Sequence, residues 1–149
     1  MVALRLPPLT GGRIAAIVAE DDFADPALLF NVQLWAGMHY IRRSGLALLN
    51  SPWLDVPDNW LRVREPHPCQ FLNPVLMRHC LADAEDRPDR PPLDVLVGVR
   101  TQPLPGPERR ITAAIAGRYG LTRRVWDSPY LSIYARPDVR MSATFGGKP

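Results

Sequence analysis

The sequence has little cysteine, a single lysine and no long hydrophobic run, and these shortages exclude several classes of protein. Its 149 residues contain two cysteines, too few for the disulfide framework of a small secreted domain. The longest uncharged run, residues 26–41, is too short to span a bilayer. Residues 1–8 lack the apolar stretch and the small-residue cleavage site of a signal peptide. We therefore expect a cytoplasmic protein with reduced thiols and no membrane partner.

Sequence motifs for cofactors and for common catalytic mechanisms are also missing. The chain has no Walker loop, no Rossmann glycine pattern and no HExxH motif. The pair Gly11-Gly12 is too little for a phosphate-binding loop. The sequence thus predicts no cofactor and no catalytic residues, and it favours a non-enzymatic function.

Charge is distributed unevenly along the chain. Residues 1–98 hold nine arginines against twelve acidic residues, a net −3. Residues 99–149 hold nine basic residues against three acidic ones, a net +6. Such an asymmetry indicates that the C-terminal half faces a polyanion. Two alternatives stay open, namely a charge match between the two halves of the molecule and simple chance.

The length fits one domain with an ordinary core, and seventeen prolines predict many turns. We expect a single α+β domain, residues 1–149, in which N-terminal helices (13–49) pack on a small mixed or antiparallel sheet. The expected strands lie within 60–65, 93–100 and 121–135. A proline-rich segment, 87–92, is the candidate for an internal boundary.

Three helices are expected before residue 90. The first covers 13–20, where apolar residues lie on one face. The second has Asp25 as its N-cap, Pro26 at its first position and Gly45 at its end. The third runs from Pro74 to about residue 86, and its expected buried stripe is Met77, Cys80, Leu81 and Ala84.

Residues 111–126 carry the most specific pattern in the chain. Ala116 is small, Gly120 follows four positions later, and Val125-Trp126 is a bulky apolar pair. This spacing resembles the two-helix core of bacterial helix-turn-helix regulators, in which the first turn of the second helix contacts a DNA groove. The resemblance implies a non-catalytic nucleic-acid-binding protein with a regulatory role and with DNA as the expected ligand. The expected contact residues are Arg109, Arg110, Arg118, Thr122, Arg123 and Arg124.

A second interpretation of the same segment is a βαββ unit. It has a strand at 93–100, a helix at 108–119 with Gly120 as its C-cap, a strand at 121–126 and a strand at 130–135. Pro129 favours it, because a proline would stop a second helix after about two turns.

Cysteines and histidines suggest a further site, which the spacing does not favour. Cys69, Cys80, His67 and His79 lie within fourteen residues. Structural zinc ligands are usually two to four residues apart, whereas His79 and Cys80 are adjacent and diverge on a helix. We expect no metal site. A small cysteine-dependent enzyme, with Cys69 as nucleophile and His79 or His39 as base, stays a third functional alternative.

Tryptophan and proline favour a second alternative function, that of an adaptor. Trp53 and Trp60 flank a turn in an irregular, proline-rich segment. Tryptophans in such a segment are typical anchors of a protein interface, and the partner would be another protein or a second copy of the chain.

Overall fold

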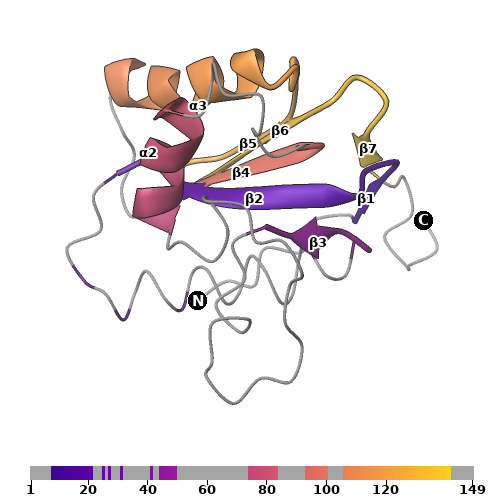
Figure 1. The fold of residues 1–149 in the computed structure, drawn as a ribbon, viewed down its shortest axis with the longest axis horizontal. Helices are drawn as coiled ribbons and strands as arrows, with labels where there is room; N and C mark the ends of the chain where they lie inside the picture. The colour runs from indigo at the N-terminus through magenta and orange to yellow at the C-terminus, as the bar shows by residue number, and fades with distance from the viewer. Residues whose placement is uncertain are drawn as a thin grey trace.

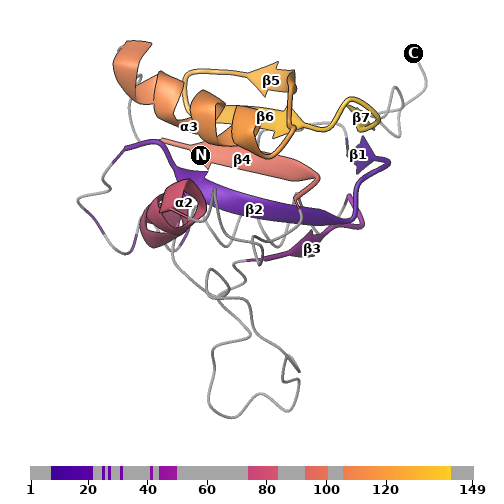
Figure 2. The ribbon, with the colours of Figure 1, turned by 45° about the horizontal axis from the view of Figure 1, so that its top comes forward.

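The structure is a computed structural model that describes residues 8–21, 25, 27, 31, 41, 44–49, 74–83, 93–100 and 106–141, with the backbone alone at 83 and 106–110. Within these ranges the chain forms a mixed five-stranded sheet, a short two-stranded sheet and, on one face of the larger sheet, the helices α2 and α3 (Figures 1 and 2). The elements are, in chain order, β1 (Leu9–Thr10), β2 (Ile14–Ala19), β3 (Ala47–Leu48), α2 (Pro74–Asp83), β4 (Val95–Val99), α3 (Gly106–Arg118), β5 (Arg123–Asp127), β6 (Leu131–Ala135) and β7 (Arg140–Met141).

The five-stranded sheet has the order β3-β2-β4-β6-β5. Strands β2, β3 and β4 are parallel, whereas β6 runs antiparallel to both β4 and β5. The two-stranded sheet pairs β1 with β7, with Leu9 opposite Met141. The expectation of a mixed sheet with helices is therefore confirmed.

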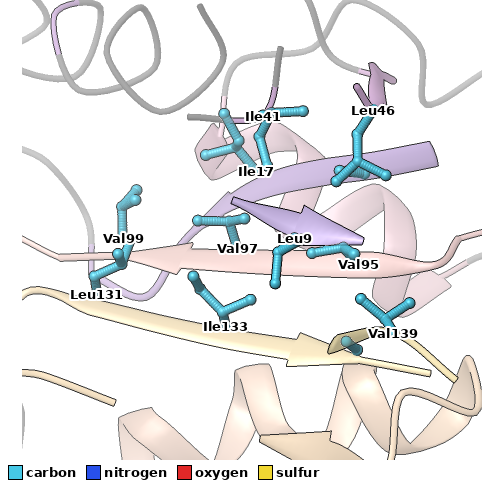
Figure 3. Packing of buried hydrophobic residues seen from close by; sticks show 12 residues of the cluster. Leu9, Ile17, Ile41, Leu46, Val95, Val97, Val99, Leu131, Ile133 and Val139 are labelled. Atoms are coloured by element: carbon cyan, nitrogen blue, oxygen red, sulfur yellow. The ribbon is translucent and has the colours of Figure 1, made fainter. Parts of the chain in front are cut away.

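Both faces of the sheet are covered by apolar residues. On one face, Ala16, Val18 and Leu96 pack against Met77 and Leu81 of α2 and against α3. On the other face, alternate residues of β2, β4 and β6 pack with side chains from outside the sheet (Figure 3). The latter are Leu9, Ile41, Leu46 and Val139. Burial on both faces explains why β2 and β4 are continuous apolar runs without an alternation of polar and apolar residues.

The expected helix at 13–20 is wrong, because Ile14–Ala19 is the interior strand β2. Its residues alternate between the two core clusters, with Ala15 and Ile17 on one face and Ala16 and Val18 on the other. A short, wholly apolar run has no periodicity that separates a buried strand from a buried helix. Pairing with β4 on one side and β3 on the other makes it a strand.

The helix-turn-helix interpretation of 111–126 is wrong in its second half. Helix α3 ends at Arg118, and Gly120 takes a left-handed φ of 72°. Leu121 N–H donates to the Ala116 carbonyl at 2.8 Å and Gly120 N–H to the Gly117 carbonyl at 3.1 Å, the two bonds of a Schellman cap. The chain then enters strand β5 in place of a second helix. The βαββ interpretation is confirmed.

Both caps expected for the helix after Asp25 are present. Ala27 N–H donates to Asp25 Oδ1 at 2.9 Å, as at an N-cap. Gly45 has a φ of 71°, and Leu46 N–H donates to the Ile41 carbonyl at 3.1 Å. Most of this helix, the expected strand 60–65 and the boundary at 87–92 lie outside the described residues.

The third helix is confirmed over Pro74–Asp83, and Met77 and Leu81 are buried as expected. The expectation of reduced thiols is wrong for Cys80, which is disulfide-bonded. The other cysteine, Cys69, lies outside the described residues. None of the helices in the described ranges is long and apolar enough to cross a membrane.

Candidate nucleic-acid interface

Strand β5 carries two of the residues that the sequence assigns to nucleic-acid binding, Arg123 and Arg124. It is an edge strand that pairs with β6 alone, and its register shifts between Arg124 and Trp126. Because side chains alternate along a strand, these two arginines point to opposite faces of the sheet. The register agrees, since Arg123 lies opposite Ala135 and Arg124 opposite Tyr134. The two residues therefore do not converge on one surface.

The positive charge of Arg124 is partly neutralised by the carboxylate of Asp127. Its Nη1 lies 3.6 Å from Asp127 Oδ2, and its side chain is exposed. An exposed pair of this kind contributes little to stability, about 0–1 kcal/mol, but it lowers the positive potential around Arg124.

Arg123 instead meets a second arginine. Its Nη1 donates to the Val139 carbonyl oxygen at 3.1 Å, and Nη1 of Arg140 approaches the same oxygen at 3.3 Å. Arg140 also donates to the Pro137 carbonyl. Both side chains belong to exposed residues, and within the described part of the chain neither forms an ion pair with a carboxylate. We call Arg123 and Arg140 the arginine pair.

Strand β7 brings Arg140 to this position. It pairs with β1, and the Thr10 hydroxyl donates to the Arg140 carbonyl at 3.3 Å. Both short strands lie at one end of the five-stranded sheet (Figures 1 and 2). At the same end, Arg136 is neutralised, because its guanidinium lies 2.9 Å from Asp94 Oδ1 and 3.0 Å from Asp138 Oδ2.

The remaining expected contact residues are distributed around α3 and the turn after it. Arg118, in the last turn of α3, and Thr122, just before β5, are exposed. Arg109 and Arg110 are in α3, but their side chains lie outside the described part of the structure. Trp53 and Trp60 lie outside the described residues.

A second arginine cluster lies at the opposite end of the sheet, around Arg100 just after β4. Its guanidinium forms a buried ion pair with Glu20 and contacts Asp127 Oδ1 at 3.3 Å. It also donates to Ser132 Oγ at 3.0 Å and to the carbonyls of Ser128 and Pro129. These five acceptors engage all five N–H groups that an arginine side chain has. We call this set the closed cluster.

The closed cluster stands where ligands often bind in α/β sheets, beyond the carboxyl ends of the parallel strands β2 and β4. Two observations indicate a structural role instead. Arg100 has no donor left for a ligand, and both Arg100 and Glu20 are buried. Gly98 leaves room for the Glu20 carboxylate, because a Cβ at position 98 would lie 2.8 Å from Glu20 Oε1, closer than normal packing allows.

Tyr134 lies beside the closed cluster and is partly buried. Burial raises the pKa of its phenol above the ordinary value of 10, and the negative charge of Glu20 raises it further. The neutral phenol is therefore the favoured form next to the cluster.

Neither alternative site chemistry gains support from the described residues. His79 is exposed on α2, and Cys80 is disulfide-bonded, so it is not a free thiol ligand. Within the described ranges, no three histidine, cysteine or acidic side chains are grouped so that they could hold a metal ion. His67 and Cys69 lie outside those ranges.

Comparison of the chain with protein-family models, with curated proteins and with solved structures found no match in any of the three.

Arg140 and Arg100 were both missed at the level of sequence. Arg140 belongs to the basic C-terminal half, and that excess of charge was the only signal available for it. Arg140 lies near Arg123 because β7 pairs with β1, which comes 130 residues earlier in the chain. For Arg100 the available signal was an arginine directly after an apolar strand, a position that favours burial with an acidic partner.

Proposed function

We propose that the chain is a non-catalytic nucleic-acid-binding protein whose ligand is DNA and whose central contact is the arginine pair. The observation that carries the proposal is that Arg123 and Arg140 are exposed, lie against one carbonyl oxygen and have no carboxylate partner among the described residues. Thr122 and Arg118 flank Arg123 in sequence, and Arg109 and Arg110 are further candidates for phosphate contacts.

Electrostatics supports an anionic ligand at this position. Two guanidinium groups held close together repel each other, by about 1 kcal/mol at 4 Å in water and by more near a protein surface. An anion that binds both groups removes this repulsion. Arginine also binds phosphate oxygens through paired N–H groups, which suits a nucleic-acid backbone.

The neighbouring arginine in the same strand provides a matched control. Arg123→Ala and Arg124→Ala remove the same charge from adjacent positions of β5. Only Arg123 belongs to the arginine pair, whereas Arg124 faces Asp127 on the other side of the sheet. Any difference between the two variants therefore reports the local site and not the net charge.

Binding of a fluorescent duplex, measured by anisotropy at low salt, tests the proposal. We expect Arg123→Ala to raise the Kd about tenfold, as for the loss of one charge-assisted hydrogen bond. Arg124→Ala should raise it less than about threefold. Absence of binding by the unmodified protein, or equal effects of the two substitutions, would refute the proposal.

A further inference from the structure

We infer that the protein binds duplex DNA through its phosphate backbone, without reading the base sequence. This inference rests on the proposed function and narrows it to one class of recognition. It depends on which elements carry the arginine pair and on how far those elements could enter a groove.

Distinguishing all four base pairs requires an element that enters the major groove, which is about 12 Å wide and about 8.5 Å deep. A helix or a two-stranded ribbon is the usual element. At Arg123 the chain is a strand hydrogen-bonded to β6 within the larger sheet. It therefore cannot separate from the body of the protein to enter a groove.

The ribbon formed by β1 and β7 is too short and too deeply packed for base reading. Each strand has two residues, a length of about 7 Å, which is less than the depth of the groove. One side of the ribbon is anchored in the core, because Leu9 is 2% exposed and Val139 is fully buried. In this ribbon and the turn before β7, the exposed residues are Thr10, Pro137, Asp138 and Arg140, and Arg140 alone among them is basic.

Helix α3 does not supply the missing element. Its C-terminal end adjoins the start of β5, and the negative end of a helix dipole disfavours phosphate. The affinity at this end of the sheet therefore comes from arginine side chains on the outer surface of the fold. Such side chains can contact phosphates along the outside of a duplex, and these contacts carry no sequence information.

Salt dependence and sequence dependence together test the inference. Two duplexes of equal length, one AT-rich and one GC-rich, are titrated over a series of salt concentrations. We expect their Kd values to agree within about twofold. For the variant with both Arg123→Ala and Arg140→Ala, the slope of log K against log salt should decrease by about 1.8, the value for two phosphate contacts. Arg124→Ala should leave that slope nearly unchanged.

Each other outcome has a distinct meaning. Binding of both duplexes with Kd values more than tenfold apart would overturn the inference and leave the proposed function standing. An unchanged slope in the double variant would also overturn it, because the phosphates would then be bound elsewhere. If neither duplex binds at low salt, the proposed function itself fails.

Discussion

Arg100 at one end of the sheet is enclosed by the protein, whereas Arg123 and Arg140 at the other end are exposed. Arg100 is buried, and its five N–H groups all have acceptors from the protein. The arginine pair is exposed and shares a single carbonyl oxygen. Donors that are satisfied inside the fold hold strands together, whereas donors left at the surface are available to a ligand.

The difference follows from where the acidic residues lie. Glu20 and Asp127 come directly after β2 and at the end of β5, so both reach Arg100. At the other end of the sheet, Asp94 and Asp138 both contact Arg136, and neither contacts the arginine pair. The two ends can therefore be disturbed by separate substitutions.

The largest effect is expected at the closed cluster. Glu20→Ala leaves the Arg100 charge buried without its main partner, which should lower the free energy of unfolding by about 3–5 kcal/mol. Urea denaturation followed by circular dichroism measures this loss. Arg124→Ala, which breaks only the exposed pair with Asp127, is the control and should cost less than about 1 kcal/mol. A loss below 1 kcal/mol for Glu20→Ala would mean that the cluster is not structural.

An intermediate loss of stability and of DNA affinity is expected at Gly11, whose backbone lies against the residues that hold the arginine pair. Gly11 has a φ of 91°, and a Cβ there would lie 2.9 Å from the Asp138 carbonyl oxygen, next to Val139. Gly11→Ala should therefore cost about 2–3 kcal/mol of stability and should also weaken DNA binding, because the Val139 carbonyl must shift.

Gly120→Ala is the matched control for this prediction. Gly120 also has a left-handed φ, 72°, but beyond its two chain neighbours no other residue comes within 4 Å of the added Cβ. It should cost about 1 kcal/mol and leave the Kd for DNA unchanged. Equal affinities of the two variants would show that the arginine pair does not depend on this backbone contact.

The smallest expected effect is a change of folding stability with pH, through Tyr134. Because the folded protein raises the pKa of Tyr134, its neutral form stabilises the fold below pH 10, and this contribution is lost as the pH rises through the raised pKa. Absorbance at alkaline pH should show a tyrosine step above the ordinary pKa of 10, and Tyr134→Phe should remove that step. A titration curve unaffected by Tyr134→Phe would contradict the assignment.

Local signals were sufficient for much of the fold. The β-branched run of β4, the proline start of α2 and the glycine after α3 each have one dominant structural interpretation. Asp25 and Gly45 likewise mark helix ends, because capping depends on residues next to each other in sequence. These features were predictable without knowledge of the tertiary structure.

Long-range pairing explains what the sequence could not show. The identity of Ile14–Ala19 as a strand depends on β4, some eighty residues later, and not on its own periodicity. The spacing of Ala116, Gly120 and Val125 fits a helix pair as well as a capped helix before a strand, and pairing with β6 decides between them. The proximity of Arg123 to Arg140 follows from the same sheet geometry, so only part of the candidate site was predictable.

The pairing of β1 with β7 has a consequence for the order of events in folding. Thr10 and Arg140 are 130 residues apart, and closing so long a loop costs much chain entropy for two short strands. We therefore expect this ribbon to form after the main sheet and to open first under mild denaturant, with fast amide exchange in β1 and β7. The surface that holds Arg140 would then be the last of the described parts of the molecule to fold and the first to unfold.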